Sequence, residues 1–347
     1  MKHEVKTLAE ILNQPAVWEQ CLHDLDGMNF HSLAAEHDPR VTPWLFVGCG
    51  TSYYLAQAAS ASFISLLGAP AQAVPASEIL LQPHLVFPGS TAHFPVLISR
   101  SGHTSEILQV AEYLQQRSIP FLAVTCDGQE LAQMTDKVLK LNVVEESTVM
   151  TSSFTSMLLA LQYVAASIAG NRDFLTALRT LPSHLSRLLA TYPAQIERFA
   201  ERSFEDFAFL GQGILYAIAS ETALKVMESS STYAQYFHTL EFRHGPKSIA
   251  GPRALIGALL SESGFAVESR VLLEMKQLGS QIFAITNTAS PELRAAADLL
   301  VELDLPVPEL ARAIVYVVWG QLLGAYRGLA KGLDPDNPTN LTRVVTI

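Results

Sequence analysis

The sequence predicts an α/β protein with two similar domains, each a parallel β-sheet flanked by helices. Strand-like apolar segments occur at 44–47, 71–75, 94–99, 120–126 and 137–143, and helical segments lie between them near 53–66, 104–117 and 128–134. Strands that alternate with helices are typical of βαβ units, whose strands run parallel. A chain of 347 residues, 49% hydrophobic and 16% charged, is long enough for two domains with large cores.

An internal repeat supports the second domain. Three segments of the first half, each offset by 161 to 163 residues, return in the second half: 46–50 as 209–213, 97–102 as 259–264, and 121–125 as 282–286. One match could arise by chance, but three in register indicate a duplication. We therefore expect five parts: a helical lead-in over 1–29, domains over 30–170 and 200–330, a helical connector over 171–199, and a closing tail over 331–347.

Charge and cysteine content narrow the class of protein. A net charge of −10 and a pI near 5.5 argue against nucleic acid and anionic membranes as partners. The three cysteines are scattered and lack metal-ligand spacing, which favours a reducing cytoplasm. The N-terminal residues contain no apolar signal core. Apolar stretches at 154–169 and 313–325 contain polar residues, so we expect core helices there and a soluble, cytoplasmic protein.

Two glycine- and hydroxyl-rich loops follow predicted strands of the first domain. In a parallel sheet such loops lie at the ligand-binding edge, and each leads into a helix whose N-terminus favours an anion. Either loop alone could be only a helix cap or a turn, whereas the pair favours phosphate. The candidate phosphate-binding residues are Gly50, Thr51, Ser52, Ser99, Arg100, Ser101 and Thr104.

The corresponding loop of the second repeat differs in charge. Glu262 stands in place of Arg100, so we expect only the first domain to bind phosphate. The Gly48–Tyr53 segment lacks the third glycine of the dinucleotide fingerprint, and no GxxxxGK[ST] motif occurs, so neither a nicotinamide cofactor nor nucleotide hydrolysis is indicated. We expect no cofactor and no metal.

Residues 221–246 contain the strongest candidates for catalysis. On the helix expected there, Glu221, Lys225 and Glu228 share one face. His244 follows, immediately before Gly245-Pro246, in a turn that presents its side chain. A solvated face with one Glu–Lys pair is the simpler interpretation, and periodicity alone does not decide. A carboxylate, an ammonium and an imidazole at one place would suit proton transfer at a sugar carbon.

These motifs together resemble the sugar isomerase (SIS) family. The resemblance is closest to the isomerase half of glutamine–fructose-6-phosphate aminotransferase and to stand-alone aminosugar-6-phosphate deaminases and fructosamine-6-phosphate deglycases. It runs from about residue 40 to the C-terminus. The motifs are Cys49–Ser52, Ala76–Glu78, Ser99–Thr104, Glu145–Thr155, the Asn340-Leu341 tail and, most specifically, the spacing of Glu221, Lys225, Glu228 and His244-Gly-Pro.

The resemblance implies a role for each candidate. Ser52, Ser99, Ser101 and Thr104 would bind the sugar phosphate, and the segment that contains Thr151 would line the pocket through its backbone. Glu228 would move a proton between C1 and C2, with Lys225 and Glu221 beside the sugar. His244 would assist ring opening from a neighbouring subunit, which implies a homodimer with shared active sites.

Departures from the family pattern bear on the reaction. The glutaminase half, with its N-terminal cysteine, has no counterpart here, so we expect no synthesis of glucosamine 6-phosphate from glutamine. Arg343 stands where the family has a lysine that forms an imine, and a guanidinium, which stays protonated, cannot do so. His103 replaces an acidic or amide residue, and Ser152 replaces a lysine.

We therefore expect a phosphosugar enzyme that takes nitrogen off an aminosugar 6-phosphate. Glucosamine 6-phosphate giving fructose 6-phosphate and ammonia is the leading hypothesis. A fructosamine-6-phosphate deglycase is the first alternative, in which Arg343 or Arg243 would bind the carboxylate of the amino acid. An aldose–ketose phosphosugar isomerase and a non-catalytic sugar-phosphate sensor are the others.

Overall fold

Two five-stranded sheets form the frame of the protein. The computed structural model describes residues 5–89, 92–127 and 129–344, which divide into two compact units. The first unit, comprising 16–146, 152–180 and 342–344, holds the first sheet. The second unit, comprising 5–15, 147–151 and 181–341, holds the second sheet.

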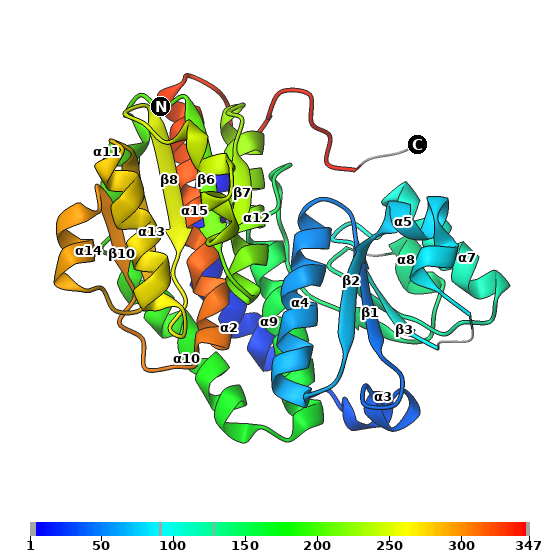
Figure 1. The fold of residues 1–347 in the computed structure, drawn as a ribbon. Coiled ribbons are helices and arrows are strands. Elements are labelled where there is room, and N and C mark those ends of the chain that lie inside the picture. The colour runs from blue at the N-terminus through cyan, green and yellow to red at the C-terminus, as the bar shows by residue number, and fades with distance from the viewer. Residues whose placement is uncertain (1–4, 90–91, 128, 345–347) are drawn as a thin grey trace. The chain divides into compact units, whose positions relative to one another are not determined.

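The first sheet is parallel throughout, in the order β2-β1-β3-β4-β5. Its strands are β1 (Trp44–Gly48), β2 (Ala71–Pro75), β3 (Phe94–Ile98), β4 (Leu122–Thr125) and β5 (Val138–Lys140). The helices are α3 (His31–Glu36), α4 (Thr51–Leu67), α5 (Ala76–Leu81), α6 (Pro83–Val86), α7 (Ser105–Gln116), α8 (Gln129–Gln133) and α9 (Ser152–Ala169). Helices α4 and α9 lie on one face of the sheet, and α5, α7 and α8 on the other (Figure 1).

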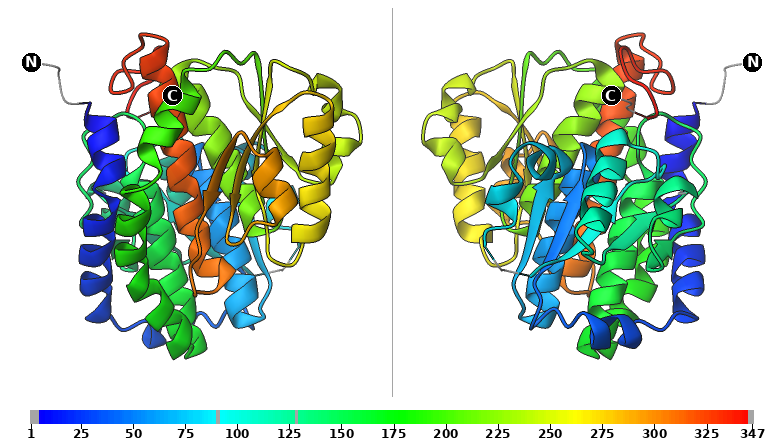
Figure 2. Two further views of the ribbon diagram at one scale, coloured as in Figure 1. Left: turned by 90° about the vertical axis from the view of Figure 1, so that its left-hand side faces the viewer. Right: turned by 90° about the vertical axis from the view of Figure 1, so that its right-hand side faces the viewer.

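The second sheet is also parallel, in the order β10-β9-β8-β6-β7. Its strands are β6 (Asp206–Gly211), β7 (Gln235–His238), β8 (Ala254–Leu259), β9 (Gln281–Thr286) and β10 (Leu299–Glu302). The remaining helices of this unit are α1 (Lys6–Leu12), α11 (Pro193–Ala200), α12 (Ile214–Ser230), η1 (Glu241–Arg243), η2 (Pro246–Ile249), α13 (Phe265–Gln277), α14 (Pro291–Ala296) and α15 (Glu309–Ala330). Helices α13 and α14 cover one face, and α11, α12 and α15 cover the other (Figure 2).

The two sheets repeat one strand order. If β6 is matched to β1 and each later strand to its counterpart, both sheets read second-first-third-fourth-fifth. The three repeated sequence segments fall on β1 and β6, β3 and β8, and β4 and β9. The predicted alternation and parallel pairing are therefore confirmed. Strand β7 was not predicted, because its four residues are polar or aromatic and only partly buried.

The unit boundaries differ from the continuous domains expected at 30–170 and 200–330. Residues 5–15, expected as part of a separate lead-in, belong to the second unit. Helix α1 packs on α15, and Gln14, the residue that follows Asn13, donates from Nε2 to Gln321 Oε1 at 2.9 Å. Residues 147–151 join it as well, and the Ser147 N–H donates to Glu10 Oε1. Helices α2 (Gln14–Asp26) and α3 precede the first sheet. Helices α10 (Arg172–Leu189) and α11 occupy the segment expected as the connector.

Helix α9 is both long and apolar. Among the described residues it is the one helix long and apolar enough to cross a membrane, and 83% of its apolar stretch is buried inside the protein. Helix α15 is likewise buried over most of its length. The burial of both helices agrees with the expectation of core helices at 154–169 and 313–325.

Candidate functional site

The candidate residues fall into two groups, one in each unit. The first unit holds the two hydroxyl-rich loops and Arg343. The second unit holds the candidates Glu221, Lys225, Glu228 and His244. Thr151 also belongs to the second unit, where it is buried and its carbonyl accepts a hydrogen bond from Gln321 Nε2 at 3.1 Å.

The first loop is the turn from β1 into α4. Gly50 has φ +54°, a conformation that favours glycine, and a Cβ on Gly48 would lie 2.2 Å from the Ser52 carbonyl oxygen. Both glycines are therefore needed for this turn, which buries Thr51 and Ser52 in the first turn of α4. Burial, with a smaller contribution from Glu106, raises the pKa of Cys49 to about 12, so its thiol stays neutral at pH 7.

The second loop, Ser99–Thr104, is organised by its own hydroxyl groups. The Gly102 N–H donates to Ser99 Oγ at 3.1 Å, the His103 N–H donates to Ser101 Oγ at 3.2 Å, and Ser99 Oγ lies 3.2 Å from Thr104 Oγ1. Thr104 precedes α7, but its side chain makes no capping hydrogen bond. A helix cap therefore does not account for Thr104.

Arg100, a candidate for phosphate binding, has its guanidinium in a buried ion pair. Its guanidinium pairs with Glu145, with Nη1 2.9 Å from Oε2, and both side chains are buried. The backbone carbonyl of Arg100 accepts the N–H groups of Cys126 and Asp127. The side chain expected to bind phosphate is thus engaged by a carboxylate of its own unit.

The corresponding loop of the second unit is occupied by a carboxylate. Ser261 donates its N–H and its hydroxyl to Glu268 at 2.7 and 2.9 Å, whereas the N–H of Ser99 bonds to the Val124 carbonyl. Glu268 is 2% exposed, and burial raises its pKa although the bonds from Ser261 lower it. An anion would compete with Glu268 here, and the absence of phosphate binding at this loop stays a prediction.

Helix α12 brings Glu221, Lys225 and Glu228 together. Lys225 Nζ lies 3.2 Å from Glu221 Oε1 and 2.5 Å from Glu228 Oε2. The side chains of Glu221 and Lys225 are buried, while that of Glu228 is 19% exposed. Burial alone would lower the pKa of Lys225, but the two carboxylates outweigh it and raise the pKa. Lys225 is therefore a fixed ammonium beside the one carboxylate that solvent reaches.

Three glycines of α15 hold α12 close. A Cβ on Gly320 would lie 2.5 Å from the Thr222 side chain, one on Gly324 would lie 2.6 Å from the Lys225 carbonyl, and one on Gly328 would lie 2.1 Å from the Ser229 carbonyl. Their four-residue spacing places them on one face of α15. This spacing was readable in the sequence, but sequence reasoning did not connect it with the candidate helix.

His244 ends the short helix η1 and is exposed. Its N–H donates to the Glu241 carbonyl at 2.9 Å, and Gly245 has φ +127°, which only glycine adopts readily. Within the part of the chain that the structure describes, His244 makes no hydrogen bond or ion pair with Glu228. His238, which the sequence pattern did not single out, stacks on Tyr216 with ring centroids 3.8 Å apart.

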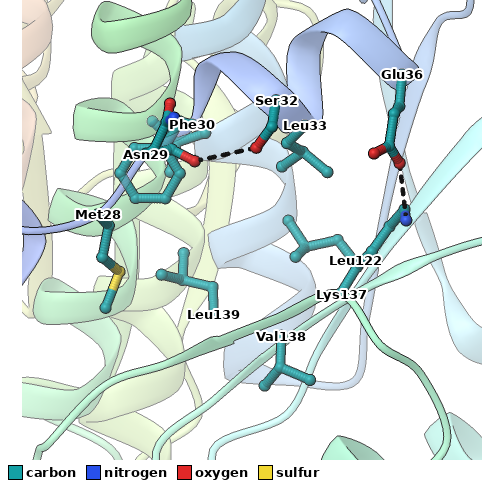
Figure 3. Close-up of a pocket in the computed structure, with 11 residues that line it drawn as sticks. Met28, Asn29, Phe30, Ser32, Leu33, Glu36, Leu122, Lys137, Val138 and Leu139 are labelled. Carbon is teal, nitrogen blue, oxygen red and sulfur yellow. Dashed lines mark hydrogen bonds and ion pairs between the residues drawn. The ribbon is translucent and has the colours of Figure 1, made fainter.

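A cavity of about 250 Å³ lies elsewhere in the first unit (Figure 3). Leu122 and Val138, the first residues of β4 and β5, contribute to its wall, so it lies at the amino ends of these strands. Lys137 and Glu36 form an ion pair of 2.9 Å beside it (Figure 3). The two candidate loops follow the carboxyl ends of their strands, so this cavity is separate from them.

The chain is an α/β protein of two parallel sheets, with hydroxyl-rich loops at the carboxyl ends of strands in the first sheet. The comparison with protein families gives the class: residues 44–167 match the SIS domain. This stretch therefore forms a SIS domain, which confirms the resemblance seen in the motifs. The match covers the first sheet and most of α9, and the assignment of the second sheet to a tandem SIS domain stays a prediction.

Relatives of known name extend the similarity to nearly the whole chain. An isomerizing glutamine–fructose-6-phosphate aminotransferase of Methanothermobacter thermautotrophicus is 28% identical over 344 residues, covering 98% of this chain and 57% of the relative. The same enzyme of Haemophilus influenzae is 28% identical over 87% of this chain and 51% of the relative. The chain thus spans somewhat over half the length of these curated relatives.

Two solved structures show the same fold. A glucosamine-6-phosphate deaminase of Thermotoga maritima aligns with a TM-score of 0.80 and 29% identity, covering 99% of this chain and all of that one. A tagatose-6-phosphate ketose/aldose isomerase of Escherichia coli aligns with a TM-score of 0.83 at 22% identity, which shows the likeness of fold alone.

Proposed function

We propose that the protein is an aminosugar-6-phosphate deaminase, with glucosamine 6-phosphate as substrate and fructose 6-phosphate and ammonia as products. The observation that carries the proposal is the arrangement on α12: a partly exposed carboxylate, Glu228, fixed by the buried ammonium of Lys225. A carboxylate held in this way can take a proton from one carbon and return it to the next. The relative from Thermotoga maritima carries the name of this activity.

In the proposed reaction Glu228 removes the proton from C2 of the open-chain sugar and delivers it to C1. The amino group at C2 becomes an imine, and water adds to it and releases ammonia. The hydroxyl groups of Ser52, Ser99, Ser101 and Thr104 would bind the 6-phosphate. His244 would assist ring opening.

The positive charges of Lys225 and Arg343 support a substrate that already carries nitrogen. An enzyme that attaches nitrogen through an imine needs a neutral amine as nucleophile. Lys225 has a raised pKa, and Arg343 carries a guanidinium. Neither group suits imine formation with a ketose. Removal of an amine needs no such nucleophile.

A deglycase is the second candidate, and Arg343 favours it. The guanidinium of Arg343 is 42% exposed and lies in the first unit with the hydroxyl-rich loops. It could bind the carboxylate of an amino acid joined to fructose 6-phosphate. In that reaction the proton moves from C1 to C2, and water releases the amino acid and glucose 6-phosphate.

A coupled assay for ammonia and fructose 6-phosphate tests the proposal. With glucosamine 6-phosphate, we expect equal amounts of both products and a rate about 10²–10⁴-fold lower for Glu228→Gln. Glu197→Gln on the exposed face of α11 is the matched control and should keep full activity. Product from Glu228→Gln at the wild-type rate would assign the base elsewhere. An inactive wild type would contradict the proposal, and fructosamine 6-phosphates would then be tested for amino acid release.

A further inference from the structure

Arg100 lies where three segments of the first unit meet. Its guanidinium donates from Nη1 to Glu145 Oε2 at 2.9 Å and from Nη2 to the Arg343 carbonyl at 3.4 Å. Its own carbonyl accepts the N–H groups that follow β4, both at 3.0 Å. One residue thus connects the hydroxyl-rich loop Ser99–Thr104 with the Glu145 segment and the C-terminal tail.

The contact with Glu145 is firmly held. Besides Arg100, the Glu145 carboxylate accepts the hydroxyl of Ser152 at 3.2 Å and both the N–H and the hydroxyl of Ser153, at 3.3 and 2.5 Å. The carboxylate and the guanidinium are both buried. A buried carboxylate with this many donors fixes the planar guanidinium in one orientation, because any rotation would leave a buried charge unpaired.

The contacts of the tail are weaker by comparison. The bond from Arg100 to the Arg343 carbonyl and the ion pair of Arg343 with Asp127 are each 3.4 Å long. The side chains of that ion pair are 42% and 52% exposed. The exposed ion pair contributes little stability, so the position of residues 342–344 depends mainly on the partly buried bond from Arg100.

We propose that Arg100 is a positioning residue that holds the tail at residues 342–344 beside the hydroxyl-rich loop. Its guanidinium does not contact the substrate phosphate; one side is anchored on Glu145, and the other offers an N–H to the tail. The consequence for catalysis, a tail held beside the bound sugar phosphate, rests on the proposed function.

Two variants separate the tail contact from the folding of the loop. Arg100→Lys keeps a charge next to Glu145, but a single ammonium cannot replace both arms of the guanidinium. The double variant Arg100→Gln/Glu145→Gln removes both charges, so no buried charge is left unpaired. Arg117→Lys, an exposed position at the end of α7 whose guanidinium lies over the Tyr113 ring, is the matched control.

Limited trypsin digestion, followed by mass spectrometry, measures release of the tail as cleavage after Arg343. Proteolysis of this kind reports local opening. We expect cleavage there to be roughly five- to tenfold faster in both Arg100 variants than in wild type, with other sites and the Arg117→Lys control unchanged. Unchanged cleavage after Arg343 in folded Arg100→Lys would overturn the inference.

Steady-state kinetics gives the second readout. We expect Arg100→Lys to raise the KM for glucosamine 6-phosphate about tenfold while kcat changes less, as for a residue that affects substrate binding alone. A tenfold fall in kcat with an unchanged KM would overturn the proposed role in binding. If the wild type is inactive on this substrate while cleavage is still accelerated, the proposed function fails and the positioning of the tail stands.

Discussion

Lys225 shows how one buried charge constrains the chemistry. Its pKa is raised above the ordinary lysine value, so its contribution to stability is complete at neutral pH and is lost only as the pH rises through the folded value. We expect no covalent adduct when the protein is treated with borohydride and fructose 6-phosphate, because the ammonium cannot form an imine. Intact mass spectrometry tests this expectation. An adduct mapped to Lys225 would contradict it.

The same residue allows a test of stability. Replacing Lys225 with Met leaves Glu221 and Glu228 without their shared cation, one of them fully buried, and we expect a loss of about 3–5 kcal/mol in the free energy of unfolding. The double variant Glu221→Gln/Lys225→Met should recover much of this loss. Lys247→Met, which breaks a partly exposed pair with Glu274, should change the free energy by less than about 1 kcal/mol. Urea denaturation measures all three.

The raised pKa of Glu268 predicts that the stability of the protein depends on pH. Its pKa is raised in the folded protein, so the folded state binds more protons than the unfolded state between the ordinary value and the raised one. Stability should therefore fall as the pH rises through that window. Glu268→Gln should remove this part of the dependence, which thermal melting across the window would show. An identical dependence in the variant would assign it to other groups.

At the scale of elements, the position of α12 depends on the glycines of α15. A Cβ on Gly324 would lie 2.6 Å from a backbone oxygen, which cannot move aside as a flexible side chain can. We expect Gly324→Ala to destabilise the protein by about 1–3 kcal/mol and to lower activity beyond the loss of folded protein, since Lys225 is at the contact. Gly251→Ala, where a Cβ would meet nothing within 4 Å, is the control and should change neither.

The elements differ in how far the sequence predicts them. Buried strands such as β1 and β3 are apolar and end in glycine or serine turns, so their place and parallel direction could be predicted. Strand β7 is short and partly exposed and has no such pattern. The helix face of Glu221, Lys225 and Glu228 follows from spacing alone. The partner of Arg100 could not be predicted, because Glu145 is 45 residues away and local spacing says nothing of such a contact.

At the scale of the molecule, the two sheets reproduce one topology, whereas the loops at their edges have diverged. In the second unit Glu268 accepts the N–H and hydroxyl of Ser261, whereas in the first unit the hydroxyl groups of Ser99 and Thr104 lie within hydrogen-bond distance of each other. The repeat was readable as three segments in register. The assignment of 5–15 and 147–151 to the second unit could not be predicted from the sequence, because it depends on contacts between residues far apart in sequence.

The expected dimer leads to a test at the same scale. His244 is exposed, and within the described part of the chain it makes no hydrogen bond or ion pair with Glu228. If each active site takes Glu228 from one chain and His244 from the other, a mixed dimer of Glu228→Gln and His244→Ala has one intact site and one doubly altered site. Co-refolding equal amounts of these two inactive variants should then restore about a quarter of the wild-type activity, since about half of the dimers are mixed. Each variant refolded alone is the control. If the mixture stays inactive while native mass spectrometry shows mixed dimers, both residues of a site come from one chain.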